Sequence, residues 1–202
     1  MDRHLPLSCA LLSNRQMSEA DALTIENGVS GFDLMKTAGR AVFDRLITSF
    51  PDAASIHVIC GPGNNGGDGY IVAELLRQAG REVKVSSVTP IENLSGDAAL
   101  AHRHWRGGVV PFHPGELDDV DLIVDALFGA GLSRPVEGEA LDWITAINEA
   151  DVPVLSIDLP SGVNGDTGEA GTLAIAAVET VTFFRKKPGH LLNPGKALCG
   201  LI

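Results

Sequence analysis

Residues 56–69 read Ile-His-Val-Ile-Cys-Gly-Pro-Gly-Asn-Asn-Gly-Gly-Asp-Gly, a short apolar run followed directly by a loop rich in glycine. An apolar run of this length predicts a buried strand, and the glycines predict a tight connection from a strand to a helix. Further apolar runs alternate with helical stretches along the chain, which is typical of a parallel sheet covered on both faces. We therefore expect an α/β fold, a Rossmann-like three-layer α/β/α sandwich with a mostly parallel central sheet.

The other elements follow from the same periodicities. Strands are predicted at 83–88, 109–112, 122–124, 154–157, 178–184 and 197–202. Helices are predicted at 69–79, 95–106 and 139–150. Two further helices come first: Ser13 and Gln16 form a capping-box pattern for one helix, and Ser30 opens the next.

Composition excludes several classes of protein. The chain has 202 residues with 15 Lys plus Arg against 26 Asp plus Glu, a net charge of −11, so we expect neither nucleic-acid nor anionic-membrane binding. No apolar run approaches the ~20 residues of a membrane span. Cys9, Cys60 and Cys199 show no metal-site or disulfide spacing, which favours reduced thiols and a cytoplasmic protein. The six histidines are expected at solvated surface positions.

Polar, glycine-rich segments follow four of the predicted strands. They occupy 61–69, 125–135, 158–162 and 185–189. Ligands of such folds bind beyond the carboxyl ends of the strands, so we expect these segments to converge on one crevice.

The first segment contains G-x-G-x-x-G at Gly61, Gly63 and Gly66, whose backbone amides are suited to a phosphate. The next predicted strand lacks the terminal acid that would bind a ribose, so a plain NAD-dependent dehydrogenase fits poorly. The alternative is a tight turn that binds no ligand.

Asp125 ends an apolar strand, where a carboxylate is costly unless it is paired or ligating. Together with Asn65 and Ser161 it offers an oxygen donor set for a hard cation, with potassium, sodium, magnesium and calcium left open. The alternative for Asp125 alone is a helix cap or a hydrogen bond that braces a loop.

Asp158 also follows a strand, ahead of a Pro-Ser-Gly turn, and is a candidate general acid or base. Its alternative is bracing of the turn at Pro160. Near the C-terminus four cations occur without an acid, which indicates either a patch for an anionic ligand or a solvated charge run. These cations are Arg185, Lys186, Lys187 and Lys196.

Three motifs carry a resemblance to a known family. They are Gly-Pro-Gly-Asn-Asn-Gly-Gly-Asp-Gly at 61–69, Val-Asp-Ala-Leu-Phe-Gly at 124–129 and Asp-Leu-Pro-Ser-Gly-Val at 158–163. In this order the sequence resembles the YjeF N-terminal family, the NAD(P)H-hydrate epimerases, over nearly the whole chain.

The resemblance implies an isomerase that interconverts the R and S forms of hydrated NADH and NADPH (NADHX and NADPHX), so that a dehydratase specific for S can recover them. It implies Asp158 as the catalytic residue that contacts the reacting ring, and a potassium ion bound by Asn65, Asp125 and Ser161. The implied substrate-binding residues are Asn64, Asn65, Gly66, Gly67, Asp68, Gly129, Ala130, Gly131, Leu132, Ser133, Arg134, Pro135 and Asp158.

Several alternatives stay open at this point. The chain is expected to form one domain over residues 1–202, and whether it continues into a fused dehydratase domain is left open. So are a homodimer and the preference between NADHX and NADPHX. The rival functions are a non-catalytic nucleotide-binding or scaffold module of the same fold and an oxidoreductase that uses NAD directly.

Overall fold

The computed structural model describes residues 10–117, 119–132 and 134–202. Its strands are β1 (Ser55–Cys60), β2 (Glu82–Ser87), β3 (Leu122–Ala126), β4 (Val154–Ile157) and β5 (Glu179–Val181). They form one sheet in the order β2-β1-β3-β4-β5, and every neighbouring pair is parallel. The helices are α1 (Asn14–Glu26), α2 (Gly31–Ser49), α3 (Asn64–Gln78), α4 (Gly96–His104), α5 (Glu139–Glu149) and α6 (Gly195–Leu198).

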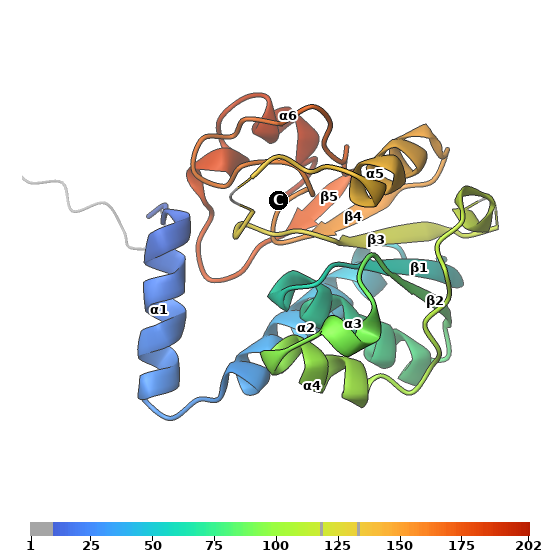
Figure 1. The fold of residues 1–202 in the computed structure, drawn as a ribbon, viewed down its shortest axis with the longest axis horizontal. Coiled ribbons are helices and arrows are strands. Elements are labelled where there is room, and N and C mark those ends of the chain that lie inside the picture. Colours follow the sequence, from blue (N-terminus) through green and yellow to red (C-terminus); the bar gives the residue numbers. More distant parts are fainter. Residues whose placement is uncertain (1–9, 118, 133) are drawn as a thin grey trace, which may run out of the picture.

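Helices cover both faces of the sheet, which confirms the predicted three-layer fold. In Figure 1, α2, α3 and α4 lie against one face and α5 lies against the other. Alternate strand residues supply the two cores. Val58 and Val124 belong to the core beneath α2, α3 and α4, whereas Ile59 and Ile123 pack with the apolar side of α5.

The two N-terminal helices begin where the capping patterns predict. Ser13 and Gln16 form a capping box at α1, and the Ser30 side chain accepts from the Asp33 amide at the start of α2. Helix α1 stands beside the rest of the fold (Figure 1) and buries only Met17. None of the helices in the described ranges is both long and apolar enough to cross a bilayer.

Some of the predicted boundaries were wrong. Segment 109–112 forms a single parallel bridge between Val110 and Ser86, because Pro111 has no amide hydrogen to continue a ladder. Segment 197–202 also forms only one bridge, between Leu201 and Glu179, because α6 occupies its first residues. Helix α3 begins five residues before the predicted start at Gly69, so 64–69 is helical rather than loop.

Candidate functional site

The carboxyl ends of β1, β3 and β4 bring three of the predicted segments together. Gly129 lies between Asn65 of α3 and Asp158 after β4. A Cβ atom on Gly129 would lie 2.9 Å from Asp158 Oδ2 and 3.0 Å from Asn65 Oδ1. The structure therefore brings Asn65, Gly129 and Asp158 together at the carboxyl ends of the strands, as the parallel sheet predicts.

The glycines of 61–69 are packed against protein atoms. A Cβ on Gly61 would overlap the Leu127 carbonyl oxygen, and one on Gly67 would lie 2.5 Å from Met35 Cε. These glycines therefore let α3 approach the sheet and α2 closely. The helix starts at Asn64 after Gly63, which has no side chain to cap it, so the first amides of α3 are suited to an anion.

Asp158 is held in an unusual geometry. Its φ is +66°, a left-handed conformation that is uncommon for a residue with a side chain. Its Oδ2 accepts from the Ala130 amide at 2.8 Å, and its Oδ1 accepts from Lys187 Nζ at 2.5 Å and Thr182 Oγ1 at 3.2 Å. Burial acts to raise the pKa of this carboxyl, but the Lys187 charge and these hydrogen bonds outweigh it, and the pKa lies below its usual 3.8.

Lys187 and His190 both contact Asp158: the sequence placed the segment of Lys187, 185–189, at this end of the sheet without giving Lys187 a role, and it did not place His190 there. The Lys187 side chain is only 2% exposed, and its Nζ also donates to Thr182 Oγ1 at 3.0 Å. His190 Nδ1 accepts from the Lys187 amide at 2.9 Å, so Nε2 carries the hydrogen that is donated to the Asp158 carbonyl at 2.7 Å. Burial lowers the pKa of His190 and keeps its ring neutral.

The expectation that the histidines are solvated was therefore wrong for His190, and also for His57, because both side chains are fully buried. The available sequence signal was the Lys-Pro-Gly-His stretch at 187–190, directly after a strand-end segment. A lysine three residues before a histidine is not itself specific, so the pairing became visible only in the fold.

Asp125 lies at the end of β3 and is fully buried within a set of hydrogen bonds. Its Oδ2 accepts from Ser156 Oγ at 2.8 Å and from the Ser161 amide at 2.9 Å. Its Oδ1 accepts from Ser161 Oγ at 2.5 Å and from the Leu127 amide at 3.2 Å. Burial raises the pKa of Asp125 in spite of these bonds. The loop-bracing role that the sequence left open is present.

The predicted metal ligands are only partly joined. Ser161 Oγ lies 2.5 Å from Asp125 Oδ1 and 3.1 Å from the Phe128 carbonyl oxygen, which gathers three oxygens. The Asn65 Nδ2 atom is buried without a hydrogen-bond partner, and rotation of that amide would present its oxygen instead. Within the described residues no group of three or more His, Cys, Asp and Glu side chains could hold a metal.

The remaining predicted substrate residues lie on the segment after β3. Leu132, Arg134 and Pro135 line a cavity of about 270 Å³ together with Phe128, Val136 and Glu137. Asp158 and the start of α3 do not line it. Ala130 is buried, Gly131 is exposed, and Ser133 lies outside the described residues.

Asp68 and Asp21 add two carboxyl groups near Asp158. Asp68, on α3, is nearly buried, and burial, followed by the charges of Asp158 and Asp21, raises its pKa well above 3.8. Asp21, on α1, also has a raised pKa because of partial burial, and the Lys187 charge opposes that shift. Asp21 on helix α1 therefore interacts electrostatically with this group of charges, which no motif indicated.

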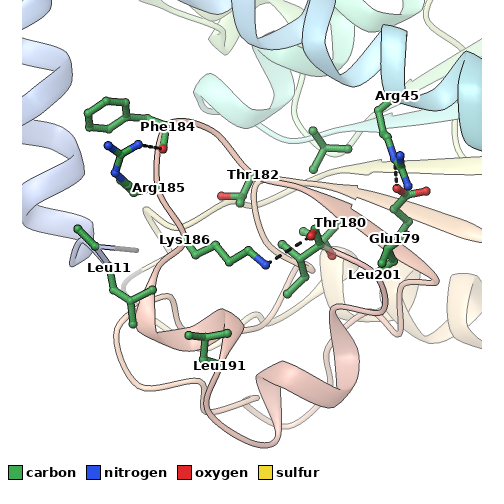
Figure 2. Close-up of a pocket in the computed structure, with 13 residues that line it drawn as sticks. Leu11, Arg45, Glu179, Thr180, Thr182, Phe184, Arg185, Lys186, Leu191 and Leu201 are labelled. Carbon is green, nitrogen blue, oxygen red and sulfur yellow. Dashed lines mark hydrogen bonds and ion pairs between the residues drawn. The ribbon is translucent and has the colours of Figure 1, made fainter. Parts of the chain in front are cut away.

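The four cations near the C-terminus do not form one patch. Lys187 points to Asp158, whereas Lys186 Nζ donates to the Ile202 carbonyl at 3.4 Å and Arg185 lies over the Phe184 ring. Figure 2 shows Arg185 and Lys186 beside a larger cavity of about 880 Å³ along the outer edge of β5. Asp158 and Lys187 do not line this cavity, but Thr182, whose Oγ1 donates to Asp158 Oδ1, does, so the cavity adjoins the Asp158 site at Thr182.

Comparisons with known proteins give a consistent result. A family model described as YjeF-related protein N-terminus matches residues 31–189. The "NAD(P)H-hydrate epimerase" of Limosilactobacillus fermentum is 39% identical over 93% of this chain and 91% of its own length. The "Bifunctional NAD(P)H-hydrate repair enzyme Nnr" of Coxiella burnetii is 40% identical over 94% of this chain but only 40% of its own length.

A solved structure shares the fold. The crystal structure of yeast ynu0 (YNL200c) superposes with a TM-score of 0.78 at 23% identity, covering 90% of this chain and 83% of the yeast chain. In length, this chain covers most of the Limosilactobacillus fermentum relative but less than half of the bifunctional Coxiella burnetii relative.

Proposed function

This chain belongs to the YjeF-related N-terminal family, and on that premise we propose that it interconverts the R and S forms of hydrated NADH and NADPH. The reaction is an isomerisation at the hydroxyl-bearing carbon of the reduced nicotinamide ring. The family is matched over 31–189, which includes β1, β3, β4 and the segments that follow them.

One observation carries this proposal: Asp158 is a fixed, ionised carboxylate directly after the carboxyl end of β4. Its side chain is 15% exposed, so part of the carboxylate can face a ligand while Lys187 donates to Oδ1 and the Ala130 amide donates to Oδ2. Loss of the ring hydroxyl leaves a planar iminium-like cation, and water can return to either face of it. A preorganised carboxylate stabilises such a developing positive charge more effectively than mobile water does.

The substrate is held by the residues around that carboxylate. The amides at the start of α3 suit the anionic part of a nucleotide, since the Asn64–Asp68 stretch forms its first turn. Gly129 and Ala130 lie against Asp158, and the Ala130 amide donates to Asp158 Oδ2. We therefore assign the phosphates of the substrate to the start of α3 and its reduced ring to Asp158.

We also propose a potassium ion held by Asn65, Asp125 and Ser161. The buried, unpartnered Asn65 amide and the raised pKa of the buried Asp125 both suit a cation, and the donors are all oxygens. When bound, the ion supplies positive charge that balances Asp125 between the two strand-end segments. Asp125 and Ser161 fix the shape of these segments through their own hydrogen bonds.

The functional partner proposed here is a dehydratase specific for the S form. An epimerase is useful only if a second enzyme removes one epimer, because interconversion alone leaves the total of hydrated nucleotide unchanged. Relatives named as bifunctional repair enzymes are consistent with such a pairing.

The test uses mixed R and S NADHX with an added S-specific dehydratase, and follows recovery of NADH by absorbance. The wild-type protein should convert the R fraction to NADH faster than the spontaneous rate, and Asp158→Asn should not. Binding without faster recovery would favour the non-catalytic module, and hydride transfer to an added carbonyl compound would favour the oxidoreductase.

A further inference from the structure

The Asp158 carboxylate leaves one chemical requirement of the proposed reaction unmet. A hydroxyl group leaves carbon readily only as water, so a proton must reach it. Asp158 has a pKa below 3.8 and is ionised at neutral pH, so it has no proton to give at the start of the reaction. Another group must carry that proton.

Among the described residues, Lys187 is the charged proton donor that contacts the Asp158 carboxylate directly. Its Nζ lies 2.5 Å from Asp158 Oδ1 and 3.0 Å from Thr182 Oγ1, and its side chain is 2% exposed. Burying an ammonium is costly without an ionic partner, so the fold maintains this pair against its desolvation cost. The bond from the Lys187 amide to His190 Nδ1 fixes the backbone from which the side chain extends.

On the basis of the proposed function, we propose that Lys187 is the general acid of the epimerisation and Asp158 is the counter-ion. In the forward step the C–O bond breaks with both electrons going to oxygen. The oxygen takes a proton from Lys187 Nζ and leaves as water, and the ring-nitrogen lone pair forms the C=N bond. In the return step a water oxygen bonds the other face, the C=N electrons return to nitrogen, and the released proton returns to Nζ.

The charges at the site favour this assignment. Before the step the pair is Asp158 carboxylate with Lys187 ammonium. After it, the pair is Asp158 carboxylate with the ring cation, while Lys187 is a neutral amine. The positive charge passes from Lys187 to the ring while Asp158 stays its ionic partner, so the net charge of the site does not change. A low-dielectric site favours a step of this kind over one that creates an unpaired charge.

Asp68 is the competing acid. It is nearly buried on α3, and its raised pKa keeps it protonated over a wider pH range than an ordinary carboxyl. It makes no hydrogen bond to Asp158 within the described residues, whereas Lys187 does. Asp68→Asn therefore tests Asp68 as the alternative general acid. Asp21 on α1 also interacts with the charges of Lys187 and Asp158.

The decisive variant is Lys187→Arg, because a guanidinium keeps the positive charge beside Asp158 but does not release a proton at neutral pH. The rate of equilibration between R and S NADHX is measured directly by chromatography, without the coupling enzyme. We expect Lys187→Arg and Lys187→Met to lower kcat at least about a hundredfold with KM within about threefold. The neighbouring Lys186→Ala, whose Nζ points to Ile202 instead, is the matched control and should keep the wild-type rate.

Chemical rescue separates proton donation from a structural role. Lys187→Ala leaves space where the side chain was, and added ethylamine should restore part of its rate saturably. Tetramethylammonium, which has the charge but no proton, should not restore it. Asp158→Asn should not respond to either cation. Circular dichroism and thermal melting of each variant show whether it folds, and Lys187→Met fills the site in case the alanine variant does not.

Each result bears on the inference. Wild-type protein that leaves the epimers unchanged would remove the proposed function, and this inference with it. An active wild type with an active Lys187→Arg or Lys187→Met variant would remove only the role of Lys187. A large loss in Asp68→Asn together with retained activity in Lys187→Met would give the role to Asp68.

Discussion

Asp125 and Asp158 occupy equivalent places in the sequence and have different roles in the structure. Asp125 lies near the carboxyl end of β3 and Asp158 directly follows β4, and these two strands are neighbours in the parallel sheet. Asp125 is fully buried and accepts hydrogen bonds from neutral donors, and its pKa is raised. Asp158 is partly exposed and paired with Lys187, and its pKa is lowered.

The two carboxylates differ because their hydrogen-bond partners differ, not because their positions at the strand ends differ. Ser156 and Ser161 are near Asp125 because β4 and the turn after it lie beside β3. Lys187 reaches Asp158 from a segment 29 residues later in the chain. A strand-end carboxylate therefore becomes a brace or a charged site according to which distant segment packs beneath it.

The largest expected effect is the loss of activity in Asp158→Asn. The substitution removes the charge that faces the reacting ring, and we expect kcat to fall by about a thousandfold, equivalent to about 4 kcal/mol of transition-state stabilisation. Asp125→Asn, measured in the same epimerisation assay, should retain activity within about tenfold. Equal losses in both variants would show that the two carboxylates do not divide the roles in this way.

Asp125→Ala should instead have the larger effect on stability. It leaves Ser156 Oγ and the Ser161 amide without their acceptor inside the core, so the free energy of unfolding should fall by about 3 kcal/mol. Urea denaturation followed by fluorescence gives this value, and Asp151→Ala on the exposed turn before β4 is the comparison. A loss below about 1 kcal/mol would mean that the Asp125 hydrogen bonds are replaced easily.

Much of the fold was predictable, because three apolar runs mark β1, β3 and β4 and a parallel sheet determines where their ends meet. The short strand segments at 109–112 and 197–202 were not, since apolar character alone does not reveal the effect of Pro111 or of α6 on a ladder. Asn65, Gly129 and Asp158 could be placed together for the same topological reason.

Lys187 and His190 could not be assigned from the sequence. Both contact Asp158 across about thirty residues, with separations of 29 and 32. A run of cations in a sequence is typical of a solvated surface, and only the fold shows that Lys187 points inward to Asp158. The glycines of 61–69 were similarly ambiguous, since packing of Gly67 against Met35 and approach to a ligand require the same residue type.

His190→Gln sharpens the comparison from the backbone side. The left-handed Asp158 is tied by its carbonyl oxygen to His190 Nε2 at 2.7 Å, and Asp125 has no positive φ. Loss of this bond should let the Asp158 backbone relax, so we expect kcat to fall by about tenfold to thirtyfold with little change in KM. His102→Gln, whose ring packs on Tyr70, should retain the wild-type rate.

The two carboxylates should also contribute to pH-dependent stability with opposite signs. The folded-state pKa of Asp158 is lower than the ordinary 3.8, so Asp158 adds stability that is present above that value and is lost as pH falls through the folded pKa. The folded-state pKa of Asp125 is higher, so Asp125 favours folding in its protonated form and loses that advantage as pH rises through the folded pKa.

This contrast is measured as unfolding free energy against pH for the wild type, Asp158→Asn and Asp125→Asn. Relative to the wild type, Asp158→Asn should lose most stability at neutral pH and least in acid. The free energy of unfolding of Asp125→Asn, relative to that of the wild type, should be highest at neutral pH and lowest in acid. Parallel curves for the two variants would contradict the assigned directions.

The smallest expected effect is that of potassium. If Asn65, Asp125 and Ser161 hold the ion, potassium at about five times its Kd should stabilise the folded state by about 1 kcal/mol. For a chain of this size that corresponds to a rise in Tm of about 2–4 °C. Sodium at equal ionic strength should raise Tm less. Asp125→Asn removes the negative charge and should abolish the difference between the two cations, whereas Asp158→Asn should leave it in place. Stabilisation by magnesium or calcium alone, or a potassium effect that persists in Asp125→Asn, would place the cation elsewhere.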